Sequence, residues 1–283
     1  MKLVSRGIVT GLLVLLVAFV LGPSMSCVQA RSQITVQGST TVLPIAQRAA
    51  EVFMSKNPDV SISVRGGGSG NGIAALIDNA VQIANASRFI KFDEVKKAVG
   101  NGVYPVPHRI AMDGIAVVVN PKNSVEKLTI DQLKRIYTGE VTNWKQVGGP
   151  DMKIVVVSRD TSSGTYEVFE ELVLKGARVT PGALLQASNG TVSDVVSRTP
   201  GAVGYVGLAY LSDKLKAVKI GISEKAYIEP SLATVQSGQY PIARALYMFT
   251  SGWPTGDAAR FIAFILSAEG QKIVKEEGFV PLW

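Results

Sequence analysis

Three turns in this chain combine glycine with small hydroxyl side chains, and each one follows a strand-like segment and precedes a helix-like segment. They are residues 38–41 (Gly-Ser-Thr-Thr), the glycine-rich residues 66–72, and residues 159–165 (Arg-Asp-Thr-Ser-Ser-Gly-Thr). The first backbone N–H groups of a helix have no partner inside the helix and lie at the positive end of its dipole. Bare glycine backbone lets an anion approach these donors, and Ser and Thr add hydroxyl donors. One such turn also fits ordinary helix capping, but three in one chain favour a single convergent site for a small anion.

Two arginines could complete such a site. Arg159 follows the apolar residues 154–157 with only Ser158 between them, which places it at the carboxyl edge of a strand, where α/β proteins bind ligands. A guanidinium can hold an oxyanion through two N–H groups. The alternative is a surface ion pair with Asp160. Arg88 follows another short apolar stretch, and for it the sequence leaves a ligand role and a structural role equally open.

Catalytic patterns are absent from the sequence. The glycine-rich turn fails the Gly-x-Ser-x-Gly pattern because Asn71 stands where glycine is required, and it fits no nucleotide-binding motif. His108 is the only histidine and Cys27 the only cysteine, so neither a histidine-based triad nor a common zinc site is indicated. We therefore expect a binding protein that is not an enzyme and needs no metal or cofactor.

The elements that must position these turns alternate along the chain, which predicts an α/β fold. Strands are expected at residues 34–36, 60–64, 115–119 and 154–157, and helices at residues 44–56, 72–81, 257–266 and 269–277. Thr129 and Gln132 have capping-box spacing at the start of a further helix, which Gly139 can end. No internal repeat and no linker between independent domains is found.

Composition and charge support a globular protein. The chain has 283 residues, 47% of them apolar, and a formal net charge of +7. Its Lys and Arg residues are scattered without runs or interleaved aromatics, which argues against a nucleic-acid partner. A mildly positive surface would still attract a small anion.

Residues 1–30 read as an export signal. Lys2 and Arg6 precede an apolar run over residues 8–21, which is shorter than the roughly 20 residues of a membrane-spanning helix. Small residues before Arg31 offer a cleavage site, so an uncleaved membrane anchor is the less favoured reading. Acylation of Cys27 is also less favoured, because Ser24 stands where a leucine is expected.

These residues resemble a known family, the substrate-binding proteins of phosphate ABC transporters among the type II periplasmic binding proteins. The likeness runs from Gln33 to Trp283 and rests on "GSTTVLPIA", "GGGSGNGIAAL", "IANASR", "LKRIYTGEVTNWKQVGG", "VVVSRDTSSGTYEVFEELV", "PGAVGYVGLAYL" and "YPIARALYMFT". The resemblance implies a periplasmic monomer that binds inorganic phosphate and delivers it to membrane permease subunits. It implies two lobes with a ligand cleft between them, residues 31–116 plus 207–283 and residues 117–206, joined by strands that cross near Ala116 and Val206.

The resemblance also implies the phosphate ligands, which are Ser39, Thr40, Thr41, Ser69, Ser87, Arg88, Arg159, Ser163, Gly164 and Thr165. Two positions depart from the family pattern. Ser87 stands where the best-known branch has an aspartate that excludes sulfate, since that carboxylate accepts a hydrogen bond only a protonated anion can donate. Thr161 replaces an acidic residue that often pairs with the site arginine.

Three other functions remain open at this point. The chain could be a receptor for another tetrahedral oxyanion, such as sulfate or molybdate, and Ser87 keeps this alternative open. A phosphate-ester hydrolase would need catalytic groups that the sequence does not show. A signalling or surface-adhesion module would need contact features that are equally lacking.

Overall fold

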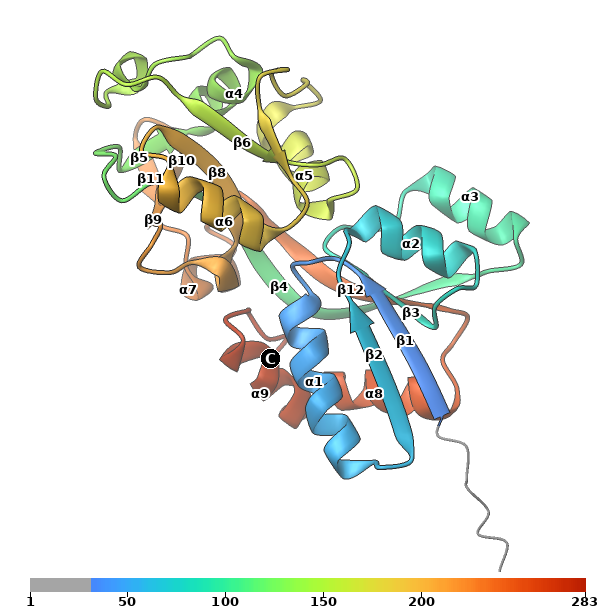
Figure 1. Ribbon diagram of the computed structural model, residues 1–283. Helices are drawn as coiled ribbons and strands as arrows, with labels where there is room; N and C mark the ends of the chain where they lie inside the picture. The colour runs from blue at the N-terminus through green and yellow to red at the C-terminus, as the bar shows by residue number, and fades with distance from the viewer. Residues whose placement is uncertain (1–31) are drawn as a thin grey trace, which may run out of the picture. The chain divides into compact units, whose positions relative to one another are not determined.

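The computed structural model describes residues 32–283, and helices and strands alternate along this part of the chain (Figure 1). This confirms the predicted α/β class. The predicted signal segment at residues 1–30, including Cys27, lies outside the described residues. Of the helices in residues 32–283, none is long and apolar enough to cross a membrane.

Most strands belong to one mixed sheet with the order β2-β1-β3-β12-β4-β8-β6-β7, and β9 pairs with β4; a second sheet has the order β11-β10-β5. The strands are β1 (Ser32–Gly38), β2 (Val60–Arg65), β3 (Ile83–Ala86), β4 (Pro105–Val119), β5 (Lys127–Thr129), β6 (Val155–Arg159), β7 (Leu184–Gln186), β8 (Ala202–Gly207), β9 (Lys216–Ala217), β10 (Lys219–Ser223), β11 (Ala226–Ile228) and β12 (Ala243–Ser251).

The helices lie between these strands and after the last one. They are α1 (Leu43–Lys56), α2 (Ser69–Ile77), α3 (Phe92–Gly100), α4 (Ile130–Thr138), α5 (Gly164–Phe169), α6 (Asn189–Arg198), α7 (Leu232–Gln236), α8 (Gly256–Leu266) and α9 (Ala268–Glu276), with the 3₁₀ helices η1 (Trp144–Val147) and η3 (Leu208–Tyr210) and the π-helix η2 (Glu170–Leu174). Thr129 accepts a hydrogen bond from the Gln132 backbone N–H, and Gly139 ends α4 with φ of 84°. Both predicted caps of this helix are confirmed.

Parallel pairing brings the predicted turns to one sheet edge. Strand β1 pairs in parallel with both β2 and β3, so the residues that follow these strands leave the sheet at the same edge. The first turn follows β1, the glycine-rich turn follows β2, and Ser87 follows β3. Strand order therefore places two predicted turns and Ser87 together.

Strand β4 connects two differently paired parts of the large sheet (Figure 1). Within its first ten residues, 105–114, all but Ile110 pair with β12, and Ile115 to Val119 pair with β8. In the second pairing Ala116 lies opposite Val206, so the two predicted crossing points are direct neighbours. Their role as hinges stays a prediction.

The buried side chains form separate cores. One core contains residues from β4, α4, β6, α5, α6 and β8 and extends through Leu208, Val235 and Ile242. A second core joins α1, β1 and β2 to α8 and α9, and a third lies around α2, β3 and Phe249. The first core thus continues beyond residue 207, where we predicted a lobe boundary, and that boundary stays a prediction.

Helix α2 differs from the expected residues 72–81, because it begins at Ser69 and ends at Ile77. It ends early because Asn79 adopts a left-handed conformation with φ of 54°. At its other end, a Cβ atom on Gly72 would lie 2.5 Å from the backbone oxygen of Gln37. Glycine inside this helix therefore lets it pack directly on β1.

Candidate functional site

The three predicted turns lie in contact. The Gly68 N–H donates to the Gly38 oxygen at 2.9 Å, and the Gly70 N–H donates to the Ser162 oxygen at 2.9 Å. These two bonds connect the second turn to the first and to the third. A further contact joins the first turn to the third, because Thr41 Oγ1 lies 3.1 Å from the Thr165 Oγ1 atom. The turns therefore form one cluster.

Glycine makes this close approach possible. A Cβ atom on Gly68 would lie 2.4 Å from Ser162 Oγ, and a Cβ atom on Gly164 would lie 2.4 Å from Ser69 Oγ and 2.8 Å from Ser87 Oγ. Gly68 also has φ of 101°, a backbone conformation that favours glycine. Any side chain at these positions would push the turns apart or fill the space beside the hydroxyl groups.

The cluster buries an unusual number of hydroxyl groups. All seven predicted ligands with a hydroxyl group are at least 92% buried: Ser39, Thr40, Thr41, Ser69, Ser87, Ser163 and Thr165. Some are held by the backbone, since Ser39 Oγ accepts from the Thr41 N–H at 3.1 Å and Ser69 Oγ accepts from the Ser87 N–H at 3.0 Å. Because burial of an unpaired hydroxyl is costly, so many together indicate a polar site.

Arg159 lies buried in the cluster at 1% exposure. Its Nε donates to the Gln186 oxygen at 3.0 Å, and its Nη2 donates to the Ala187 oxygen at 2.9 Å and to Thr40 Oγ1 at 3.3 Å. Its Nη1 is buried without a partner, and burial lowers the pKa of the guanidinium. The alternative of a surface pair with Asp160 was wrong, because Arg159 is not at the surface and the Asp160 carboxylate accepts from Ser162.

Sequence reasoning missed a second buried arginine, Arg244 on β12. Its Nη2 donates to Asp113 Oδ2 at 2.9 Å and to Thr41 Oγ1 at 3.2 Å, and its Nη1 has no partner within the described residues. Asp113 is fully buried on β4, and its Oδ1 accepts from the Leu208 N–H at 3.1 Å. Burial lowers the pKa of Arg244, and the carboxylate of Asp113 opposes that effect.

Asn189 is the other residue that the sequence analysis missed. It is fully buried at the start of α6, where Ser188 caps the helix. Its Nδ2 donates to Thr40 Oγ1 at 3.2 Å and to Thr41 Oγ1 at 3.1 Å, and its Oδ1 accepts from the Gly207 N–H. Asn189 therefore links the turn after β1 to α6 and β8.

The fully buried charges of this cluster do not balance, although the partly exposed Asp160 of the third turn also favours the charged form of Arg159. Arg159 and Arg244 are both buried, and of the two only Arg244 has a carboxylate within 4.0 Å in the part of the chain that the structure describes. Each carries one buried amino group without a partner. A buried charge needs a partner of opposite sign, because its loss of hydration is otherwise uncompensated. The arrangement can bind one anion between two guanidinium groups and a set of hydroxyls.

Arg88 has a different environment. Its Nη1 and Nη2 donate to the Glu94 carboxylate at 2.8 and 2.6 Å, and its Nε lies 2.8 Å from Glu167 Oε2. Lys91 Nζ also lies 2.8 Å from that oxygen of Glu167. Although burial alone favours the neutral guanidinium, these two carboxylates raise the pKa of Arg88. The geometry favours the structural role that the sequence had left open.

His108 lies outside the cluster, on β4. Its Nε2 is 2.9 Å from Thr250 Oγ1, and burial lowers the pKa of its imidazole. Across residues 32–283, no three His, Cys, Asp or Glu side chains are grouped so that they could hold a metal ion.

Comparisons with known proteins show the family to which the chain belongs. A family model described as a PBP superfamily domain matches residues 28–269. The chain belongs to this superfamily. Phosphate-binding protein PstS of Bacillus subtilis is 38% identical over 256 residues, which cover 90% of this chain and 82% of that protein. The PstS protein of Borreliella burgdorferi is 31% identical over 258 residues, which cover 88% of this chain and 90% of that protein.

Solved structures of the superfamily share the fold. A phosphate ABC transporter substrate-binding protein from Clostridium perfringens, determined with bound phosphate, has a TM-score of 0.82 at 35% identity and covers 89% of this chain and 100% of its own. A phosphate transport receptor from Vibrio cholerae has a TM-score of 0.71 at 34% identity, and the match covers 87% of this chain and 99% of the receptor. Membership of this superfamily of binding proteins confirms the predicted fold and the prediction that the chain is not an enzyme.

The buried pair of Asp113 and Arg244 gives a test of the cluster's electrostatics. We expect Asp113→Ala to lower the free energy of unfolding by about 3–5 kcal/mol, because it leaves a second buried guanidinium without a counter-charge. The double variant Asp113→Ala/Arg244→Met removes that charge and should be clearly more stable than the single variant. Urea unfolding of the anion-free proteins measures both values. A double variant no more stable than Asp113→Ala would contradict the proposed charge imbalance.

Proposed function

We propose that this protein binds inorganic phosphate and delivers it to the permease subunits of an ABC transporter. The observation that carries the proposal is that, among the fully buried charged groups of the cluster, Arg159 and Arg244 outnumber Asp113, and each guanidinium retains an amino group without a partner. A phosphate ion supplies the missing negative charge and enough acceptor oxygens for these donors. The names of the PstS relatives and the phosphate bound in the Clostridium perfringens structure support this ligand.

The proposed ligands surround the anion from the three turns. Thr40 and Thr41 follow β1, Ser69 opens α2, and Ser87 follows β3. Arg159 ends β6, and the backbone N–H groups at the start of α5 provide donors at the positive end of a short helix. The proposed set is Ser39, Thr40, Thr41, Ser69, Ser87, Arg159, Ser163, Gly164 and Thr165, with Arg244 and Asn189 in support. We assign Arg88 to the contact with Glu167.

Binding is proposed to close a cleft between two lobes, residues 31–116 plus 207–283 and residues 117–206. Ligands on both lobes bind the anion together only when the cleft is closed, so phosphate favours the closed form. Several hydrogen bonds run between the two proposed lobes, among them Gly70 N to Ser162 O and Arg159 Nη2 to Thr40 Oγ1. The permease would then receive the closed, loaded protein.

Export and a monomeric state complete the proposal. Residues 1–30 would direct the chain to the periplasm and be removed before Arg31, which would leave a mature chain without cysteine. Such a chain would depend on packing alone for its stability, since it could form no disulfide.

A second candidate is a receptor for sulfate or molybdate, and Ser87 is the observation that favours it. Ser87 Oγ lies 3.3 Å from Ser69 Oγ in a buried position where the best-known branch has a carboxylate. A hydroxyl can accept a hydrogen bond from protonated phosphate, but it can also donate one to sulfate. It therefore excludes a fully deprotonated anion less strongly than a carboxylate does.

Titration calorimetry of the mature protein with phosphate and then sulfate decides between the two. We expect phosphate to bind with a dissociation constant of about 1 μM or below, and sulfate to bind more weakly. Tighter binding of sulfate would move the assignment to the second candidate. No heat with either anion would reject both candidates. A separate assay with p-nitrophenyl phosphate tests the hydrolase alternative, because release of p-nitrophenol would indicate ester hydrolysis.

Substitution of Arg159 tests its role as a ligand. We expect Arg159→Ala to weaken phosphate binding by more than about 1.5 kcal/mol, roughly tenfold or more, because a charged hydrogen-bond donor is lost. Arg159→Lys keeps the charge but loses the planar fork, so its affinity should be intermediate. Arg48→Ala, which removes an exposed guanidinium paired with Glu51, serves as the control. Wild-type affinity in Arg159→Ala would show that this side chain is not a ligand.

Glu167 tests the proposed closure. This residue of α5 contacts Arg88 and Lys91 of the other proposed lobe. Glu167→Gln should weaken phosphate binding by about 1 kcal/mol, roughly fivefold. The largely buried contact of Glu167 with Arg88 should account for most of this loss, because Lys91 is more than half exposed and its ion pair is screened by water. Glu171→Gln is the control, because Glu171 is exposed and makes no ion pair among residues 32–283. Equal affinities of the two variants would remove Glu167 from the closing contact.

A further inference from the structure

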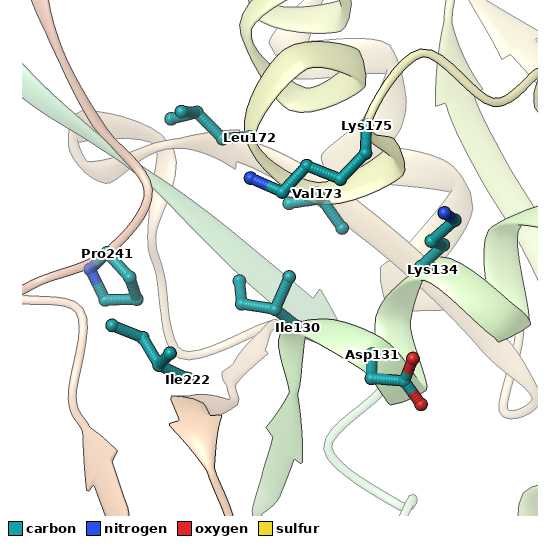
Figure 2. A pocket seen from close by; sticks show the side chains of 8 residues that line it. All are labelled: Ile130, Asp131, Lys134, Leu172, Val173, Lys175, Ile222 and Pro241. Atoms are coloured by element: carbon teal, nitrogen blue, oxygen red, sulfur yellow. The ribbon is translucent and has the colours of Figure 1, made fainter.

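A second pocket lies between α4, η2 and the residues around Ile222 and Pro241 (Figure 2). Its volume is about 440 Å³, which lies within the range of small-molecule sites in proteins. None of its lining residues belongs to the proposed phosphate site. The pocket therefore does not depend on the function proposed above.

Most of the pocket wall is apolar. Its apolar lining consists of Ile130, Leu172, Val173, Ile222 and Pro241. Ile222 is 81% exposed although it is a large aliphatic residue on β10. A ligand with an apolar body would remove these side chains from water. An inorganic anion would gain nothing from such a wall.

Two lysines give the pocket a positive charge. Lys134 of α4 and Lys175 line it together with one acidic residue, Asp131. Neither lysine lies within 4.0 Å of a carboxylate in the described part of the chain, so both ammonium groups are available to a ligand. Figure 2 shows the Lys175 side chain extended over Val173 toward Leu172, with Ile130 on the opposite side of the pocket. An acidic ligand would thus meet a cation beside an apolar surface.

The backbone that positions Lys175 is uncommon. Lys175 has φ of 53°, a left-handed conformation that non-glycine residues rarely adopt, and it ends the π-helix η2. The following residue, Gly176, also has positive φ. Short π-helices and strained residues occur frequently at functional sites. This backbone directs a lysine side chain across the pocket.

We infer that this pocket binds a small organic anion that has a carboxylate head and an aliphatic or aromatic body. The carboxylate contacts Lys175, Lys134 adds a second positive charge at the pocket wall, and the apolar body lies against Ile130, Leu172 and Ile222. A net charge of one positive unit from two lysines and Asp131 favours anionic over cationic ligands. The pocket volume suits a molecule of about ten to twenty non-hydrogen atoms.

Octanoate is the probe for this proposal, and amide NMR chemical shifts of the isotope-labelled, phosphate-loaded protein are the measurement. We expect saturable shifts at α4, η2 and β10 with a dissociation constant on the order of 1 mM or tighter, given about ten heavy atoms. Octanol, which lacks the charge, and acetate, which lacks the body, should each bind at least fivefold more weakly. Shifts at residues 38–41 and 159–165 instead, or no saturable shift, would overturn the proposal.

Variants locate the contact. Lys134→Gln/Lys175→Gln and Ile222→Asp should each weaken octanoate binding at least threefold, because the first removes both cations and the second adds a carboxylate at an exposed position. Lys272→Gln, at an exposed lysine of α9, is the matched control. All variants should keep wild-type phosphate affinity, which separates this site from the proposed transport function. Unchanged octanoate binding in both pocket variants would refute the assignment.

Discussion

A buried guanidinium without a carboxylate partner governs the arrangement of the central turns. Arg159 is 1% exposed, and its hydrogen bonds go to carbonyl and hydroxyl oxygens rather than to an acid. Such a charge is tolerated only if surrounding dipoles and a bound counter-charge replace its lost hydration. The hydroxyls of the first turn and the backbone oxygens after β7 supply the dipoles, and the proposed anion supplies the charge. In this proposal the positions of the other ligand side chains follow from the same requirement, since each must reach the same small volume.

The three turns can surround one small volume only if their backbones approach one another closely. Two glycines of the stretch after β2 allow this approach, because Gly72 lets α2 pack directly on β1 and Gly68 lets the turn contact Ser162. Gly164 does the same from the other side, beside Ser69 and Ser87. The sequence predicted that these glycines expose N–H donors, and the structure gives them a second role. They determine how near the three turns come to one another.

Local pattern explains which parts could be predicted. Each turn combines a strand, small residues and a helix within about twenty consecutive residues, so its type and approximate place can be read directly. Arg244 and Asp113 escaped because they lie in separate strands, far apart in sequence, and become neighbours only through the register of β4 with β12, where they pair directly. The available signal was one charged residue in an apolar setting, Asp113 within residues 110–119 of β4 and Arg244 within β12. The contact of Arg88 with Glu167 was equally hidden, since the two residues are distant in sequence, whereas its other partner, Glu94, lies only six residues away.

The same charges connect anion binding to closure. In the proposed division of the chain, Arg244 and Arg159 belong to different lobes, and the positive charge of Arg244 helps to lower the pKa of Arg159. Without an anion these like charges oppose each other across the cleft, whereas the contact of Glu167 with Arg88 and Lys91 attracts. In the proposed site, an anion between the arginines would replace the repulsion by two attractive interactions and shift the balance toward the closed form. A neutral ligand of the same shape would leave the repulsion in place, so the proposed closure depends on the charge of the ligand and not only on its fit.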